Sequence, residues 1–282
     1  NKAEIKVEFL HRTWAEIDVD ALVHNFGIIK KEAAGAKIMA VVKADAYGHS
    51  ARNVAPLLET EGADAFAVSN IEEAVTLRGC GITKPILILG YTPVSMVSEL
   101  YINDITQSVY SPEYAAALSQ KAAADKVRIK IHIKLDTGMS RIGFDCRDDS
   151  LSGIDEAIAA AHLPGFDFGG IFTHFAVSDR TPQEEDGFTA VQYSRFIAAK
   201  ERFIKAGLTP KICHCCNSAA FCLDTDKHLD MCRPGIILYG LTPSSGLKLK
   251  EDFIPAMTVK SVVSMVKTVK KGDTVSYGRT FT

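Results

Sequence analysis

The sequence predicts an α/β protein: a closed (β/α)₈ barrel of the TIM type, followed by the start of a second, mainly β domain. Three observations support this fold class. Short apolar runs alternate with longer amphipathic stretches eight times from residue 38 onward, and no Gly-x-Gly-x-x-Gly motif opens a helix. Two strand-like segments also remain outside the repeat. We therefore favour a closed barrel over an open, doubly wound sheet.

The apolar runs are short, and most are rich in β-branched or aromatic residues, as is typical of parallel strands buried on both faces. In chain order they are Ile38–Val42, Ala65–Val68, Pro85–Leu89, Ile105–Val109, Ile129–Leu135, Phe168–Thr173, Lys211–His214 and Gly235–Tyr239. The amphipathic stretches predict the covering helices, among them Ser50–Glu61, Asn70–Arg78, Pro112–Ala124, Asp149–Ala161 and Glu185–Ala206.

The segments outside the repeat are Trp14–Asp18 before the barrel, and Met257–Val269 and Thr274–Phe281 after it. They read as strands, and we expect them to pair in a second domain. The chain then divides into an N-terminal strand of that domain (residues 1–18), the barrel (19–245) and the start of a C-terminal β domain (246–282). We expect the β domain to need more sequence than these residues supply.

The composition is that of a globular enzyme, with 282 residues of which 47% are hydrophobic and 23% charged. A net charge of −2 provides no basic surface for nucleic acid and no polybasic strip for a membrane. A small-molecule substrate is the expected partner. Because residues 1–14 lack the apolar stretch of a signal peptide and no later run could span a bilayer, we expect a cytoplasmic protein.

Seven cysteines, an odd number without the spacing of a disulfide scaffold, indicate reduced thiols. Cys213, Cys215 and Cys216 flank His214, but neighbours on an extended strand point to opposite faces and cannot all converge on one ion. We predict buried free thiols and no metal site.

A lysine follows the first predicted strand, in the segment Val41-Val42-Lys43-Ala44. Lysines at strand ends are usually solvated charges. At the edge of an apolar barrel interior, however, an amine is partly desolvated, which lowers its pKa and frees it to bond covalently to a carbonyl group. Lys43 is therefore the candidate nucleophile.

The segment Ala40–His49 also resembles the cofactor-binding motif of the alanine racemase family. Further matches occur in the family's order over essentially the whole chain, at Lys134–Gly143, Thr173–Ala176, His214–Ala220, Arg233–Gly240 and Val275–Gly278. The resemblance implies a barrel-type isomerase that uses pyridoxal 5'-phosphate to racemise alanine and so supplies D-alanine for peptidoglycan.

The resemblance implies that Lys43 holds the cofactor and acts as one proton-transfer base, and that Tyr277 is the other. Racemisation removes a proton from one face of the α-carbon and returns it on the opposite face, so two bases are needed. His174 contacts this tyrosine and Arg233 in the family, which would help to lower the tyrosine pKa. Arg233 would face the pyridine nitrogen and, by staying protonated itself, leave that nitrogen unprotonated.

Tyr47, Ser218 and the backbone amides of Gly235 and Ile236 match the family's phosphate holders, and most of them follow the last two predicted strands, where barrels commonly bind phosphate. Arg141 matches the residue that reaches the cofactor hydroxyl and the substrate carboxylate. Lys134 matches a position at which some members carry a carbamylated lysine. The family is a homodimer with shared active sites, so we expect Tyr277 of one subunit to serve Lys43 of the other.

Three alternatives remain. A serine racemase of related sequence is the nearest. Amino-acid decarboxylases with this barrel also place a lysine after the first strand, but they would leave Tyr277 without a role. A non-catalytic barrel that binds pyridoxal phosphate is the alternative from another functional class, but such proteins lack the trailing β domain that Met257–Thr282 begins.

Overall fold

The computed structural model describes residues 12–180, 186–245, 247 and 249–282. The chain divides into a larger unit, Asp18–Ala256, and a smaller one made of the segments that end at Ile17 and begin at Met257. The larger unit extends past the predicted boundary at residue 245 because its last segment packs back onto the first helix. There the side chain of Asn25 accepts from the Ile254 N–H at 2.8 Å and donates to the Ile254 carbonyl at 2.8 Å.

The larger unit is a parallel barrel, which confirms the predicted fold class. Its eight strands are hydrogen-bonded in the order β10-β2-β3-β4-β5-β6-β8-β9. They are β2 (Lys37–Val41), β3 (Ala65–Val68), β4 (Ile86–Ile88), β5 (Ile105–Val109), β6 (Ile129–Asp136), β8 (Phe166–Phe172), β9 (Ile212–His214) and β10 (Met231–Cys232). The short strand β7 (Phe144–Asp145) lies off this path and pairs in parallel with the end of β6. Strands β9 and β10 lie at the two ends of this order, and the Asp230 N–H, just before β10, donates to the Cys213 carbonyl of β9 at 3.3 Å, so the barrel is nearly closed.

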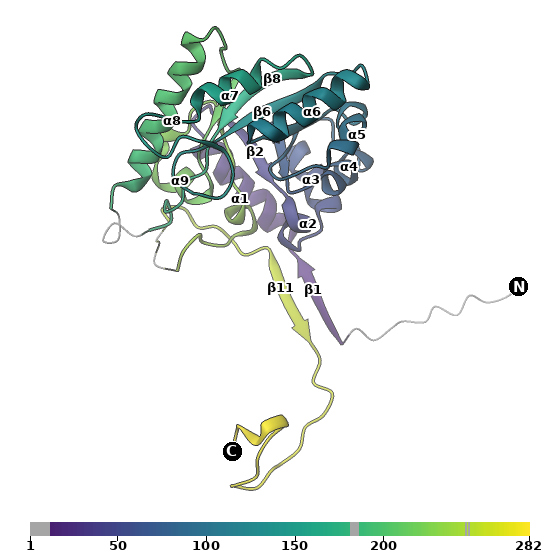
Figure 1. Ribbon diagram of the computed structural model, residues 1–282. Helices are drawn as coiled ribbons and strands as arrows, with labels where there is room; N and C mark the ends of the chain where they lie inside the picture. The colour runs from purple at the N-terminus through teal and green to yellow at the C-terminus, as the bar shows by residue number, and fades with distance from the viewer. Residues whose placement is uncertain (1–11, 181–185, 246, 248) are drawn as a thin grey trace, which may run out of the picture. The chain divides into compact units, whose positions relative to one another are not determined.

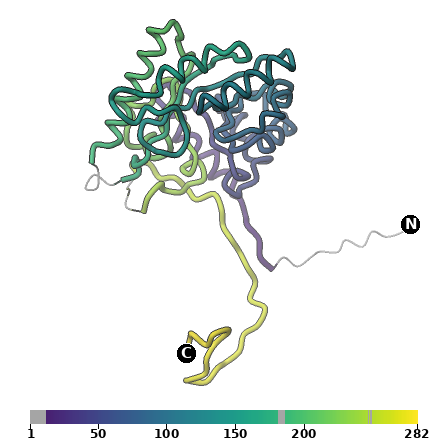
Figure 2. The backbone as a smooth tube through the Cα atoms, in the orientation of Figure 1, coloured from purple at the N-terminus to yellow at the C-terminus, as the bar shows by residue number. Residues whose placement is uncertain are grey.

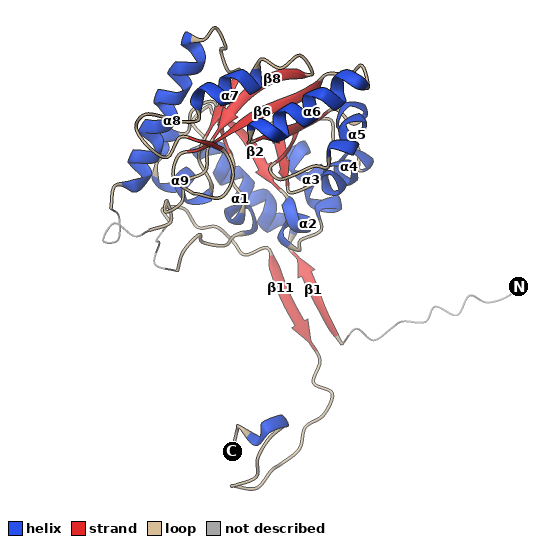
Figure 3. Cartoon of the chain, in the orientation of Figure 1, coloured by secondary structure: helices blue, strands red, loops and turns tan. Residues whose placement is uncertain are grey.

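Helices surround the strands on the outside (Figure 3) and follow one another around the barrel from α3 to α6 (Figure 1). They are α1 (Val19–Glu32), α3 (Ala51–Glu61), α4 (Ile71–Gly79), α5 (Val97–Ile102), α6 (Pro112–Ala124), α7 (Ile154–Ala161), α8 (Phe188–Lys205) and α9 (Ser218–Leu223). Several begin where the sequence supplies a side-chain cap for a free amide: Asp18 caps α1, Asn70 caps α4 and Ser111 caps α6.

The predicted eighth strand, Gly235–Tyr239, is wrong. Residues Ile236–Tyr239 form the 3₁₀ helix η3, and the eighth strand is β10, a few residues earlier. Pro234 has no N–H to donate to a ladder, and Gly235 turns the chain away with φ −124° and ψ −91°. A short apolar run does not distinguish these outcomes by periodicity. As a result Arg233 directly follows the strand, at the C-terminal mouth of the barrel.

Strand β6 shows how the barrel interior is filled. Its sequence, Ile-Lys-Ile-His-Ile-Lys-Leu-Asp, alternates apolar with polar residues. Because strand side chains alternate between faces, Lys130, His132 and Lys134 share one face. Lys130 and His132 line one cavity and Lys134 lines another, so this face points into the barrel.

The smaller unit contains β1 (Thr13–Ile17) and β11 (Met257–Ser261), which pair antiparallel with Thr13 opposite Ser261 and Ile17 opposite Met257. These segments are far apart in sequence but run side by side, as predicted (Figure 2), although β11 ends at Ser261 and not at the predicted Val269. The expected strand at 274–281 is instead a single bridge between Val275 and Phe281 that encloses the 3₁₀ turn η4 (Tyr277–Arg279). In the described part of the chain, no helix is long and apolar enough to cross a membrane.

Candidate active site

A cavity of about 540 Å³ lies at the C-terminal mouth of the barrel. Side chains that follow β2, β6, β8, β9 and β10 line it, as is usual for the active end of this fold. The cavity brings together nine of the residues singled out from the sequence: Lys43, Tyr47, Lys134, Arg141, His174, Ser218, Arg233, Gly235 and Ile236. It also contains residues that sequence reasoning missed, among them Met139, Phe172 and Asp179.

Lys43 begins an unusual left-handed turn, labelled α2 (Lys43–Tyr47). The four residues after the lysine have φ between 50° and 55°. A left-handed conformation costs a non-glycine residue roughly 1–2 kcal/mol. Hydrogen bonds hold the turn: the Ala44 N–H donates to Glu73 Oε1 at 2.8 Å, and the Ala51 N–H donates to Asp45 Oδ1 at 2.7 Å. The turn places the Lys43 amine in the cavity.

Arg233 is 4% exposed and lies at the centre of a hydrogen-bond network. Its guanidinium donates to the carbonyls of Thr173 at 2.8 Å and Cys215 at 3.0 Å, to Nδ1 of His214 at 2.9 Å and to Nδ1 of His174 at 3.2 Å. Because arginine only donates, both imidazoles accept through Nδ1 and carry their proton on Nε2. Burial, and then the charge of Arg233, hold the pKa of His174 and of His214 well below the usual value, so both rings are neutral.

His132 extends this network into the barrel and was not predicted. Its Nδ1 lies 2.9 Å from Nε2 of His214, which donates to it. Burial and the charge of Arg233 lower the pKa of His132 to about 4. The polar face of β6 was the available signal, because an alternation of apolar and polar residues in a barrel strand puts polar groups inside when helices cover the outer face.

Lys134, two residues along the same face of β6, is 3% exposed. Burial, and then the nearby Arg233, lower the pKa of its amine to about 7, and Asp136 only partly offsets this. The amine donates to the Leu135 carbonyl at 3.0 Å and lies 5.3 Å from the ring centroid of Phe172. A large fraction of Lys134 is therefore uncharged near neutral pH.

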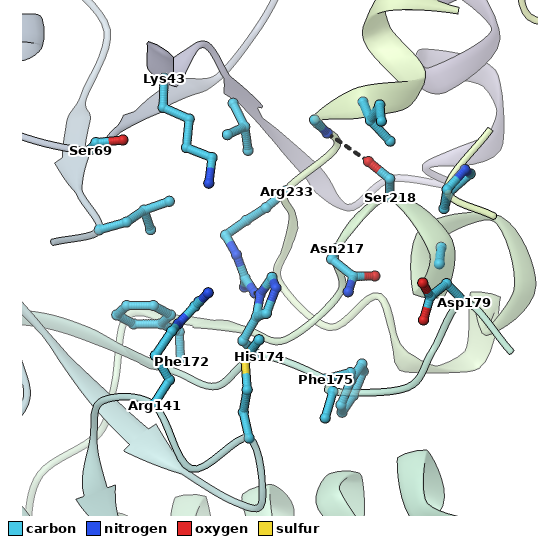
Figure 4. A pocket seen from close by; sticks show the side chains of 18 of the residues that line it. Lys43, Ser69, Arg141, Phe172, His174, Phe175, Asp179, Asn217, Ser218 and Arg233 are labelled. Atoms are coloured by element: carbon cyan, nitrogen blue, oxygen red, sulfur yellow. Dashed lines mark hydrogen bonds between the residues drawn. The ribbon is translucent and has the colours of Figure 1, made fainter. Parts of the chain in front are cut away.

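The opposite wall of the cavity is formed by α2, α9 and η3. Gly235 N–H donates to Ser218 Oγ at 2.9 Å, drawn as the dashed line in Figure 4. The Gly235 amide thus already has a partner within the protein. Ile236 begins η3, and the first N–H of a helix has no partner inside it. A Cβ at Gly235 would lie 2.9 Å from Oη of Tyr47, so only glycine leaves room for that hydroxyl.

The cavity has a large excess of positive charge. Lys43, Arg141 and Arg233 line it together with Lys134, a large fraction of which is uncharged, and Asp179 is a carboxylate in the lining. Figure 4 shows Lys43 and Arg141 reaching from opposite sides toward Arg233 and His174. Among the described residues, neither Arg141 nor Lys43 forms a hydrogen bond or an ion pair through its side chain. The mouth is therefore suited to an anionic ligand.

Tyr277, the remaining candidate, does not line the cavity. It belongs to η4 in the smaller unit, and its side chain is 99% exposed.

Comparison with known proteins shows which family shares this architecture. A family model described as "Alanine racemase, N-terminal domain" matches residues 17–243. The chain is 42% identical over 273 residues to an alanine racemase of Clostridium tetani, covering 96% of this chain and 69% of that protein. The structure of an alanine racemase from Clostridium difficile 630 superimposes with a TM-score of 0.85 at 39% identity, covering 98% and 71% of the two chains.

A solved structure of a histidine racemase from Leuconostoc mesenteroides is also similar. It has a TM-score of 0.80 at 32% identity and covers 97% of this chain and 72% of that one. The fold is thus shared by racemases named for different amino acids.

Proposed function

The chain belongs to the alanine racemase family, and from this premise we propose that it is an isomerase that interconverts L- and D-alanine with pyridoxal phosphate. One observation supports the proposal above the others. A lysine amine, a buried arginine and an unpaired arginine meet in one cavity at the catalytic mouth of the barrel.

The residues present fit this cofactor. Lys43 would hold it covalently and exchange the α-proton on one face of the substrate. The hydroxyls of Tyr47 and Ser218 and the Ile236 N–H would bind the phosphate, and Gly235 leaves the room that the Tyr47 hydroxyl needs to lie there. Burial raises the pKa of Tyr47, which keeps its hydroxyl protonated as a donor. When bound, pyridoxal phosphate supplies the electron-withdrawing ring that stabilises charge at the α-carbon.

Arg233 would face the ring nitrogen. Its partners fix the guanidinium in place, and arginine keeps its protons, so it would donate an N–H without protonating that nitrogen. This arrangement would limit charge delocalisation into the ring and favour return of the α-proton over other reactions.

Arg141, whose side chain has no partner among the described residues, would bind the substrate carboxylate. We also propose that Lys134 is carbamylated. Its pKa of about 7 leaves the neutral amine needed to attack carbon dioxide, which forms an N–C bond and releases a proton. The new negative charge would lie among the cations of the cavity.

For the second base we propose Tyr277 from the partner subunit of a homodimer. A side chain that is 99% exposed in its own chain is free to enter another subunit's cavity. We further propose a cytoplasmic enzyme that supplies D-alanine for peptidoglycan. All seven cysteines are free thiols, which suits a reducing compartment.

The test is to purify the full chain with pyridoxal phosphate, record the absorbance of the lysine-bound cofactor, and follow loss of optical activity with L-alanine, L-serine and L-histidine. We expect kcat/KM to be highest for alanine. Faster turnover of serine or histidine would reassign the substrate, and bound cofactor without α-proton exchange would support a non-catalytic barrel.

A further inference from the structure

A second cavity, of about 290 Å³, lies at the opposite, N-terminal mouth of the barrel. Residues at the beginnings of the barrel strands line it. Barrel interiors of this kind are normally filled by layers of side chains. A water molecule occupies about 30 Å³ in the liquid, so the space suits a molecule of up to about ten non-hydrogen atoms.

His132 places a ring N–H in this cavity that has no hydrogen-bond partner among the described residues. The ring is 9% exposed and lines the cavity. Its Nδ1 accepts from His214, so its proton lies on Nε2. No described residue accepts a hydrogen bond from that Nε2–H. Thr106, which is also buried, lines the same cavity, and its hydroxyl likewise has no partner among the described residues.

The backbone around the ring makes room for His132. A Cβ at Gly169 would lie 3.1 Å from Nε2 of His132, and a Cβ at Gly170 would lie 3.1 Å from its Cε1. The register between β6 and β8 shifts at this point, with Ile131 opposite Phe168 but His132 opposite Gly170. Gly169 and the bulge thus leave room for the ring, whose Nε2 contacts no acceptor among the described residues. Gly170 is required first by the Ile212 carbonyl oxygen, which a Cβ there would overlap.

The rest of the cavity has an apolar wall and a charged rim. Met39, Leu87 and Met231 belong to the wall. At the rim, Lys211 lies 3.8 Å from Asp167, and Lys130 lies 2.6 Å from Asp104. Lys37 is exposed and forms no ion pair or side-chain hydrogen bond with the described residues. Asp64 also lines the cavity, and its carboxylate accepts the Ile38 N–H at 2.8 Å. Of the three lysines in the lining, Lys37 is therefore the one whose ammonium has no partner among the described residues.

We propose that the N-terminal mouth of the barrel binds a small aliphatic monocarboxylate that carries a carbonyl or similar acceptor at the far end of its chain. The carboxylate pairs with Lys37 at the rim, the alkyl segment contacts the apolar wall, and the acceptor receives the Nε2–H of His132. A charged group at depth is disfavoured because the walls are apolar and the ring there is neutral. This site is separate from the one proposed for racemisation and does not rest on it.

The experiment measures binding rather than turnover. The full chain, with pyridoxal phosphate added and its histidines labelled with nitrogen-15, is titrated with 4-oxopentanoate, 5-oxohexanoate and 6-oxoheptanoate, and with the matched pentanoate, hexanoate and heptanoate. At least one oxo acid should bind roughly two- to tenfold more tightly than its unsubstituted partner, the value of one hydrogen bond, and should shift the His132 ring signal.

Two variants locate the ligand. His132→Phe should abolish the preference for the oxo acid while the unsubstituted acid still binds. Lys37→Gln changes an exposed residue, so this variant should fold even if His132→Phe does not. It should weaken the binding of both acids of a pair by about the same factor. The acids also resemble the proposed substrate carboxylate, so the titration is repeated in Arg141→Gln. Binding should persist there.

The inference is overturned if oxo and unsubstituted acids bind equally, if the His132 signal does not move, if Lys37→Gln leaves affinity unchanged, or if Arg141→Gln abolishes binding. None of these outcomes depends on whether the protein racemises alanine. Failure of this inference and failure of the proposed function are therefore distinguishable.

Discussion

The two mouths of the barrel use the same residue type in opposite ways, and strand β6 shows this within five residues. Lys130, at the N-terminal mouth, has a side chain that is half exposed and forms an ion pair with Asp104 at 2.6 Å. Lys134, on the same inward face at the other mouth, is buried beside Arg233, with a pKa of about 7. The residue type does not decide the chemistry. Desolvation and the neighbouring charges do.

The largest expected effect comes from removing the amine that the C-terminal mouth presents. Lys43→Ala should abolish the absorbance of lysine-bound cofactor and lower racemisation beyond about 10⁴-fold, because both the covalent attachment and one base are lost. Absorption spectra and a polarimetric assay measure the two effects. The exposed Lys205→Ala in α8 is the matched control and should leave both unchanged. Retained absorbance with a normal rate would disprove the assignment of Lys43.

The next effect tests whether the C-terminal mouth is complete within one chain. Tyr277→Ala should leave α-proton exchange with D-alanine intact and slow exchange with L-alanine by about 10²–10⁴-fold, the contribution of one positioned base. Proton exchange into deuterated solvent, followed by NMR, measures each direction.

Mixing Lys43→Ala with Tyr277→Ala subunits adds a test of the shared site. Each heterodimer should regain one intact site, and activity should rise toward half the parent value. Heterodimers that are demonstrably present but inactive would place both residues in one chain or remove Tyr277 from the mechanism.

The two β6 lysines predict different dependences of stability on pH. The pKa of Lys134, about 7, lies below the roughly 10.4 of an unfolded lysine, so between these values the unfolded chain binds more protons and stability rises with pH. The slope should approach 1 kcal/mol per pH unit. Denaturant unfolding between pH 7 and 8.5, in buffer free of carbon dioxide so that Lys134 keeps its free amine, should show that Lys134→Met lacks this slope relative to the parent. Lys130→Met should keep the slope of the parent. Equal slopes in the two variants would contradict the different roles assigned to the two lysines.

The smallest effect concerns the backbone of the C-terminal mouth. Ala44 is exposed with φ 50°, so Ala44→Gly should relieve strain and stabilise the fold by about 1 kcal/mol. Ala116, exposed in the right-handed helix α6, is the matched control, and Ala116→Gly should destabilise by about the same amount. Urea unfolding measures both, and a change of the same sign in both variants would show that strain at Ala44 is not relieved by glycine.

The alternating pattern predicted the barrel and the pairing of the segments before and after it, because periodicity and strand ends are local properties. The eighth strand was missed because Gly235–Tyr239 is as apolar as a strand, and only the geometry at Pro234 and Gly235 distinguishes it. The residues of the cavity were predictable where they follow strands. His132 lies inside a strand and was overlooked.

Other features had no local signal. The sequence Ala44-Asp45-Ala46-Tyr47 contains no glycine to indicate four left-handed residues. The hydrogen bonds that hold this turn come from outside it, through Glu73 and Ala51. The position of Tyr277 depends on another compact unit, and in our proposal on another chain, so its partner cannot be inferred from its neighbours in sequence.

The hydrogen-bonded ladder of side chains from Arg233 through His214 to His132 blocks proton transfer. Each member donates to the next, and the first acceptor, Nδ1 of His214, is already occupied by Arg233. A proton entering from the N-terminal mouth would first have to charge His132, whose pKa is about 4. At neutral pH these three residues therefore polarise one another's hydrogen bonds but do not transfer protons. In the proposed reaction, the protons exchanged at the α-carbon are therefore not supplied through this ladder.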